Sequence, residues 1–207
     1  YSITLYPPDL SGEYDFWKMR SIVEDKNNHL WMGGNSIGIS EFDGTNWHFY
    51  SREAGKIPTN LVDGICVDEN NVKWFVSLSN FFSYNDTTWT DYSDKLPIKF
   101  LNCITIDKKG VIWLGSGAGL IRFDGTNFKA ITSVDGGDIA FIDVIGADKN
   151  NVKWFCCFWR KYHNNYYVSL DESAVQVDET APAPFTTITN YPNPFNPSTN
   201  IRYQISG

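Results

Sequence analysis

Apolar residues along this chain gather in short runs that are separated by polar turn sequences. Residues 101–133 show the pattern clearly, with the runs LNCITID, VIWLGSG, GLIRFDG and NFKAITS. Each run has the length of a β-strand. The sequences DKKG and DGTN between them are typical of tight turns, because Asp accepts hydrogen bonds from nearby amides and Gly or Asn tolerates a positive φ. The pattern predicts four short antiparallel strands.

One of these turns belongs to a heptapeptide that the chain contains four times. It reads DKNNHLW (25–31), DENNVKW (68–74), DKKGVIW (107–113) and DKNNVKW (148–154), with Asp and Trp always six residues apart. We expect each copy to be a hairpin in which Asp braces the turn and Trp lies on the next strand. On this interpretation an Asp-to-Asn change is nearly neutral, because Asn also offers an acceptor oxygen.

A second mark follows the same period. The tryptophans of the heptapeptide are 43, 39 and 41 residues apart, and the segments EFDGTNWHFY (41–50), SYNDTTWTDY (83–92) and RFDGTNFKAI (122–131) keep step with them. Two marks with one period indicate an internal repeat. The repeat units are expected at about 16–60, 61–100, 101–138 and 139–170, with residues 1–15 as the outer strand of a preceding unit.

Four antiparallel strands that return about every 40 residues are typical of the blades of a β-propeller. The Trp-bearing strands are apolar on both faces, apart from Lys73 and Lys153, as expected for strands that are covered on both sides. A β-sandwich needs no repeat, and a β-solenoid has shorter coils. We therefore expect an all-β fold of about four propeller blades, as part of a larger propeller.

The repeat resembles the two-component-regulator propeller family. Residues 104–125, ITIDKKGVIWLGSGAGLIRFDG, match its pattern at nearly every position, and residues 22–44 match with one extra residue near Asn35–Ser36. The second unit departs at Phe75–Ser77, and the fourth keeps only ADKNNVKW. The resemblance covers about residues 1–170. It implies a propeller of the kind that forms the extracellular sensing part of sensor proteins, although one scaffold hosts many activities.

The composition changes near residue 171. Residues 171–190 contain DETAPAPFTTITN and are expected to be an extended linker. Residues 191–207, YPNPFNPSTNIRYQISG, resemble the opening of the type IX secretion C-terminal sorting domain. The resemblance implies export by a Gram-negative bacterium of the Bacteroidetes type, a secreted or cell-surface location, and the type IX machinery as a partner. Both ends of the chain have the character of cut ends, so we expect a fragment.

Composition narrows the partner classes. The 207 residues are 42% hydrophobic and 16% aromatic, which suits a packed β fold, and the net charge of −7 disfavours a nucleic-acid partner. No apolar run approaches the ~20 residues that span a membrane. The four cysteines form no CxxC pair, and the spacing leaves a Cys66–Cys103 disulfide open.

The sequence offers little chemistry. His29 and His48 are expected at the surface. The segment GSGAGL (115–120) is superficially similar to a dinucleotide-binding loop but is better explained by the repeat. The four heptapeptide aspartates form no calcium loop. We expect no cofactor, no metal and no catalytic residue.

Residues that break the repeat are the candidates for ligand contact, because the scaffold does not require them. Aromatic side chains beside an Arg suit stacking on sugars or gripping a partner, whereas blade packing is the alternative role. The candidates are Tyr14, Phe16, Trp17, Trp159, Arg160, Tyr162 and His163.

Together these features predict a secreted or cell-surface, non-catalytic propeller that binds a ligand or partner, such as a glycan or a surface protein. The alternatives are an extracellular hydrolase or lyase, with His163 as a candidate, and a structural or adhesive surface module.

Overall fold

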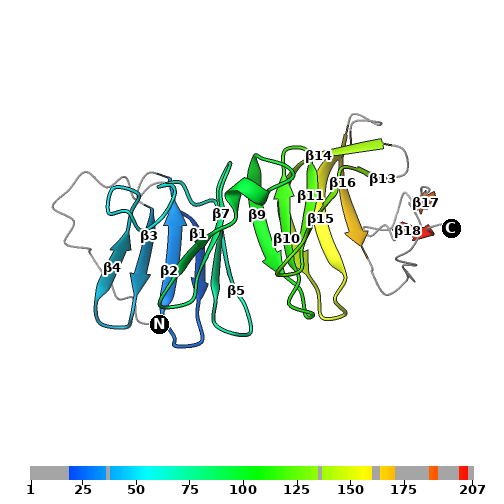
Figure 1. Cartoon of the computed structure of the whole chain (residues 1–207). Helices are drawn as coiled ribbons and strands as arrows, with labels where there is room; N and C mark the ends of the chain where they lie inside the picture. The colour runs from blue at the N-terminus through cyan, green and yellow to red at the C-terminus, as the bar shows by residue number, and fades with distance from the viewer. Residues whose placement is uncertain are drawn as a thin grey trace.

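In the computed structural model, the described residues are 19–35, 38–134, 137–159, 164–170, 187–190 and 201–204, with side chains described for 19–35, 38–133 and 138–156. They form four antiparallel four-stranded sheets that stand side by side in one row (Figure 1). We call these sheets the first to fourth blades. The expected all-β fold of about four propeller blades is confirmed.

The first three blades each contain four strands in sequence order. The first blade consists of β1 (Met19–Glu24), β2 (Leu30–Gly34), β3 (Ile39–Phe42) and β4 (Trp47–Tyr50). The second consists of β5 (Gly64–Val67), β6 (Lys73–Val76), β7 (Phe81–Tyr84) and β8 (Trp89–Asp91), followed by the short 3-10 helix η2 (Ser93–Lys95). The third consists of β9 (Leu101–Ile106), β10 (Ile112–Ser116), β11 (Gly119–Phe123) and β12 (Phe128–Ile131).

The fourth blade departs from this arrangement. It consists of β13 (Ser133–Val134), β14 (Gly137–Ala147), β15 (Lys153–Trp159) and β16 (Asn164–Leu170). The short strand β13 pairs with the start of β14, the strand that leads into the heptapeptide. β14 pairs with β15 through an irregularity between Ala140 and Val144.

The tail contains a strand where the composition predicted only a linker. β17 (Thr187–Asn190) pairs antiparallel with β18 (Ile201–Gln204) to form a two-stranded sheet. The linker at 171–190 stays a prediction. The consecutive β-branched residues Thr187, Ile188 and Thr189 favour a strand once a partner strand is available.

Each heptapeptide forms the turn that was expected. In the first copy the Asp25 carbonyl accepts a hydrogen bond from the Asn28 amide at 3.0 Å, and the Asp25 amide donates to the His29 carbonyl at 2.9 Å. The fourth turn residue has a positive φ of 63–76° in every copy, which is why only Asn or Gly occupies that position. These residues are Asn28, Asn71, Gly110 and Asn151.

The constant spacing of six residues has a second cause, which the sequence did not reveal. One oxygen of each Asp carboxylate accepts hydrogen bonds from the amides two and four residues further on, at 2.8–3.1 Å. The other oxygen accepts the indole N–H of the Trp six residues further on, at 3.0–3.1 Å. A single carboxylate thus fixes both the turn and the orientation of the ring.

The tryptophan rings of the first three blades lie between neighbouring sheets. Trp31 packs in one apolar cluster with Ile65 and Phe75 of the second blade. Trp74 packs with Ile112, Leu114 and Phe123 of the third blade, and Trp113 with Ile142, Ile145 and Phe155 of the fourth. Each Trp therefore faces the blade that follows its own, and the apolar contacts between blades form the core.

Lys73 and Lys153, the two exceptions in the apolar Trp strands, are fully buried between blades. The Lys73 ammonium lies 3.6 Å from Asp25 of the first blade, pairs also with Asp86, and sits over the Trp31 ring, 5.0 Å from its centroid. Lys153 repeats the arrangement, 3.3 Å from Asp107 and 5.1 Å from the Trp113 ring. Buried ammonium groups need such compensation from a carboxylate and an aromatic face.

The junctions between neighbouring blades alternate in character. The first–second and third–fourth junctions each contain a buried lysine, and the second–third junction does not. Between the second and third blades, Ile112 occupies the position of the lysine. The turns show the same alternation. The Lys26 amide donates to the Asn71 side chain at 2.7 Å, and the Lys108 amide to the Asn151 side chain at 2.7 Å. Gly110 of the third blade has no side chain to make this bond.

The carboxyl groups beside the buried lysines are held ionised. Burial by itself raises a carboxyl pKa, but the amide and indole donors together with the lysine charge outweigh it. The pKa of Asp25 and the pKa of Asp107 therefore lie below their ordinary value.

The cysteines make no disulfide among the described side chains, where Cys66, Cys103 and Cys156 are free. The disulfide that the sequence left open between Cys66 and Cys103 does not form, since Cys66 packs toward the third blade and the Cys103 thiol lies 3.5 Å from the Ile142 carbonyl of the fourth. Burial raises the pKa of Cys103 to about 12 and also raises the pKa of Cys66.

Truncating a buried Trp should destabilise the protein strongly. We expect Trp113→Ala to lower the free energy of unfolding by ~3–5 kcal/mol, the range for large-to-small changes in a core. Trp154→Ala is the matched control, because Trp154 is the equivalent residue of the fourth blade and is 37% exposed. For this variant we expect a decrease in the free energy of unfolding less than half as large. Denaturant melts measure both. A loss below ~1 kcal/mol for Trp113→Ala contradicts a core role.

The structure replaces the expectation that Asp-to-Asn changes are neutral. Asp107→Asn leaves the buried Lys153 ammonium without its carboxylate, so we expect a loss of ~3 kcal/mol in the free energy of unfolding. Asp68→Asn is the control, because the third blade presents Ile112 to Asp68 in place of a lysine. For this variant we expect a loss of ~1 kcal/mol in the free energy of unfolding. Equal losses in denaturant melts of the two variants contradict a contribution from the buried pair.

Acid titration provides an independent check on the same pair. A folded pKa below the unfolded one means that the unfolded chain binds more protons in acid. The stabilisation by Asp107 is therefore complete above the unfolded pKa of about 4 and is lost as the pH falls through the lower folded pKa. Asp107→Asn should show a shallower fall in stability below about pH 4 than the parent chain.

Candidate functional site between the first and second blades

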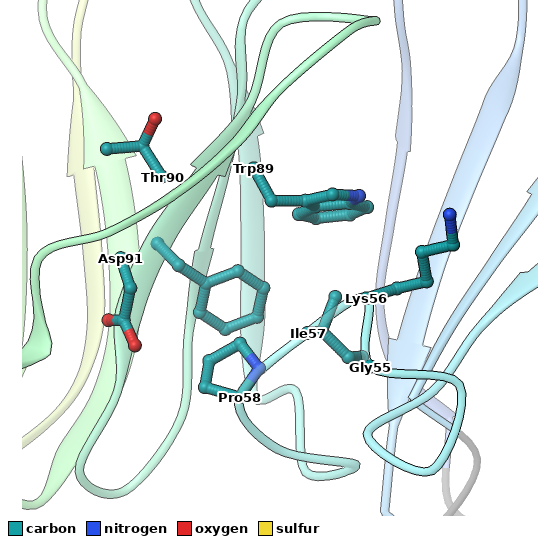
Figure 2. A pocket seen from close by; sticks show the side chains of 8 residues that line it. Gly55, Lys56, Ile57, Pro58, Trp89, Thr90 and Asp91 are labelled. Atoms are coloured by element: carbon teal, nitrogen blue, oxygen red, sulfur yellow. The ribbon is translucent and has the colours of Figure 1, made fainter.

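A hollow of about 350 Å³, which we call the outer pocket, lies between the first and second blades (Figure 2). The connection between β4 and β5 forms one side, and β7 and β8 form the other. Its lining residues are Gly55, Lys56, Ile57, Pro58, Phe82, Trp89, Thr90 and Asp91.

The β4–β5 connection is held in place by its own hydrogen bonds. The side chain of Asn60 accepts the Arg52 amide at 2.8 Å and donates to the Glu53 carboxylate at 2.8–2.9 Å. The Asn60 carbonyl accepts the amide of Gly38 at 3.0 Å. Ile57 is buried in the cluster around Trp31, so the loop is anchored on the core while Lys56 remains exposed.

Trp89 forms the aromatic wall of the outer pocket. Its ring stacks on Tyr84 with centroids 4.3 Å apart and lies close to Phe82 and Tyr50. In Figure 2 the Trp89 ring lies above Ile57 and Pro58, with Lys56 to one side and Asp91 to the other. The pocket therefore combines an aromatic face, an apolar floor and charged groups at its rim, which is the composition of small-ligand sites.

A second hollow of about 300 Å³, the polar pocket, lies between the same two blades. Its lining residues are Asn27, His29, Glu41, His48, Tyr50, Tyr84 and Asp86. The buried Glu41 carboxylate is 2.7 Å from His29 Nδ1 and accepts the Tyr50 hydroxyl at 2.6 Å. Burial raises the pKa of Tyr50, and the bond to Glu41 raises it further, so the phenol remains a donor.

The structure agrees with the prediction for His48 and corrects the one for His29. His48 lies at the surface as expected, 3.1 Å from Asp43. His29 was also expected to be a simple surface residue, but its ring is engaged with buried Glu41. Within the described residues, no three His, Cys, Asp or Glu side chains are grouped so that they could hold a metal ion.

Of the seven ligand-contact candidates named from the sequence, only Trp159 lies among the described residues. Trp159 ends β15 and pairs with Ile139 and Asn164, but its side chain is not among those described. The other candidates lie outside the described residues: Tyr14, Phe16, Trp17, Arg160, Tyr162 and His163. Their role stays a prediction.

Sequence reasoning missed the pocket residues for identifiable reasons. Trp89 occupies the same repeat position as Trp47 and Phe128, so it was counted as part of the scaffold. The usable signal was the β4–β5 connection, which is longer than the β8–β9 connection and carries Lys56 and Pro58.

Four repeated four-stranded antiparallel sheets in a row are blades of a partial β-propeller, and comparison with solved structures agrees. The extracellular domain of the hybrid two-component system BT3049 from B. thetaiotaomicron is similar, with a TM-score of 0.57 and 19% identity over 84% of this chain and 25% of that one. PorZ, a surface component of the type IX secretion system of Porphyromonas gingivalis, gives 0.54 and 17% over 72% of this chain and 25% of PorZ.

An enzyme also appears among the similar structures. Virginiamycin B lyase from Staphylococcus aureus gives a TM-score of 0.54 and 14% identity over 74% of this chain and 56% of the lyase. The chain thus spans about a quarter of the first two proteins and about half of the lyase. Identities this low establish the propeller fold alone. No protein-family profile and no curated protein sequence matches the chain.

The described residues also include no helix long and apolar enough to cross a lipid bilayer.

Proposed function

We propose that this chain is an extracellular, non-catalytic β-propeller module that binds a carbohydrate in the outer pocket. The observation that carries the proposal is Trp89, whose ring forms a wall of the outer pocket between a charged Lys56 side and a charged Asp91 side. Sugar rings present apolar C–H faces edged by hydroxyl groups. An aromatic face beside polar rim groups matches both features.

In the polar pocket one oxygen of Glu41 contacts His29 and the other accepts the Tyr50 hydroxyl. A carboxylate held in this way fixes the orientation of its neighbours, which suits a preformed binding surface. The same three side chains are where the hydrolase or lyase alternative would have its acid–base group. The hydrolase or lyase alternative is tested by assaying the same glycans for turnover.

The extracellular location rests on two supports. Two of the similar structures are described as an extracellular domain and as a bacterial surface component. Residues 191–207 resemble the start of a type IX sorting domain, so we propose that the tail directs the chain to that export machinery and that the mature protein is secreted or held at the cell surface.

The outer pocket can be tested by truncating its aromatic wall. We expect Trp89→Ala to weaken binding of glycans identified on an array by roughly 10- to 100-fold, because an aromatic anchor carries much of the energy of such a contact. Trp47→Ala is the matched control, since Trp47 holds the same strand position in the first blade outside the pocket.

Because Trp89 also packs on Tyr84, Trp89→Ala could weaken binding by disturbing the fold, so two further variants are needed as a check. Lys56→Ala and Asp91→Asn change the charge of exposed rim groups, and Asn keeps an oxygen that can accept the Ser93 amide as Asp91 does, so both should weaken glycan binding with an unchanged melting temperature. Titration calorimetry gives the affinities. Unchanged affinity in all three pocket variants, or turnover of the bound glycan, contradicts the proposal.

The tail should act as an address and contribute little to blade stability. Its strands β17 and β18 pair with each other, and a short hairpin adds little independent stability. We expect a chain that ends at Val177 to melt within a few degrees of the 207-residue chain. Hydrogen exchange is the second measurement: protection of Ile201–Gln204 amides as strong as that around Trp113 contradicts a separate tail.

A further inference from the structure

Most of the side chains that line the polar pocket use a donor hydrogen on a neighbouring group. The pocket lies between the first and second blades, and both blades have all four of their strands among the described residues. The Tyr50 hydroxyl donates to Glu41 at 2.6 Å, and the Tyr84 hydroxyl donates to the Asp86 carbonyl at 3.0 Å. Each phenol oxygen therefore has lone pairs, and no hydrogen, to offer a ligand.

The two histidines of this pocket are in the same situation. Nδ1 of His29 lies 2.7 Å from a Glu41 carboxylate oxygen, and Nε2 of His48 lies 3.1 Å from an Asp43 carboxylate oxygen. A carboxylate only accepts hydrogen bonds, so each of these nitrogens carries a proton. In a neutral imidazole the other nitrogen then has a lone pair, so Nε2 of His29 and Nδ1 of His48 are acceptors.

The charges at the polar pocket are unequal as well. Glu41 and Asp86 both line it. Lys73, which pairs with Asp86, is shared with the buried carboxylate of Asp25. With neutral imidazoles the pocket therefore has a surplus of negative charge. Of the lining side chains, that of Asn27 is the one with an amide N–H₂ to donate, so the pocket as a whole is rich in acceptors and poor in donors.

The same junction already holds one ammonium group by this chemistry. The buried Lys73 ammonium contacts the carboxylates of Asp25 and Asp86. It also lies 5.0 Å from the centroid of the Trp31 ring and 5.6 Å from that of the Tyr84 ring. Carboxylates beside aromatic faces stabilise an ammonium that has lost part of its water. Asp86 and Tyr84 also line the polar pocket, which offers a similar environment to a group from outside the chain.

We propose that the polar pocket binds a primary ammonium group of a ligand. An ammonium brings three donors and no acceptor, and its charge offsets the negative surplus of the pocket. The volume of about 300 Å³ is at the small end of ligand sites, which suits a short aliphatic amine. The pocket shares no lining residue with the outer pocket, so this proposal stands independently of the proposed carbohydrate site.

Titration calorimetry on the full 207-residue chain tests the proposal at about pH 8, where imidazole is neutral and an alkylammonium is charged. We expect Nα-acetyl-lysine amide to bind at least about tenfold more tightly than its Nε-acetylated form, which has the same chain without the charge. Butylammonium separates two sources of the group. Affinity equal to that of the lysine amide supports a free amine as the ligand, and weaker affinity supports a lysine side chain of a polypeptide.

The repeat supplies a variant that blocks the pocket and keeps the turn. The third blade has Lys109 at the turn position of exposed Asn27, and the two backbone amides make the same bond to the turn carboxylate, at 2.9 and 2.8 Å. Asn27→Lys should weaken binding of the lysine amide roughly tenfold or more, because the added ammonium repels that of the probe. Asn70→Lys is the matched control, since it makes the same change in the second blade outside the pocket.

Both variants should melt at the temperature of the parent chain, and the control should bind the lysine amide as the parent chain does. Three results overturn the proposal: no binding of the lysine amide, equal affinity for its charged and acetylated forms, or equal affinity of Asn27→Lys and Asn70→Lys for it.

Discussion

The Asp carboxylate of the heptapeptide is the contact on which the rest of this structure depends. It accepts two amides of its own turn and the indole N–H of a Trp on the next strand, in all four blades. Because an ionised carboxylate offers several acceptor sites, one short side chain satisfies buried donors from two kinds of structure. The Trp ring is thereby fixed at the blade surface, where it becomes the surface on which the next blade packs.

The buried lysines build on that contact and distinguish one junction from another. An ammonium group between two sheets is tolerated only where a carboxylate and an aromatic face meet it. The preceding blade supplies both through the same Asp–Trp pair, as Asp25 and Trp31 do for Lys73. The third blade presents Ile112 at this position, so it packs against the second blade through apolar contacts and needs no carboxylate from that blade. Blades of one repeat family thus differ in the neighbour that each accepts.

The periodic sequence predicted the local features of this fold but not the contacts between blades. The regular return of Asp and Trp was sufficient for the blades, the hairpins and the turn-bracing role, because these depend on local hydrogen bonds and strand-length apolar runs. The Asp–Trp hydrogen bond and the burial of Lys73 and Lys153 depend on side-chain orientation and on contacts between units, which no single strand pattern contains. The strand at Thr187–Asn190 was missed because its partner lies beyond a proline-rich stretch.

The candidate site follows a related logic. The Asp and Trp of the heptapeptide are engaged in the turns and the core, so the proposed site combines Trp89, at a recurring aromatic position, with residues at which the units differ. Lys56 and Pro58 lie on a connection that is longer than the one between the next two blades. Glu41, Ser83 and Arg122 occupy one repeat position, and only Glu41 is joined there to a His and a Tyr. Both departures fall at the junction of the first and second blades, where buried Lys73 and its partners hold the two sheets together. A pocket between two sheets needs such a fixed junction, because relative movement of its walls weakens any contact made across it.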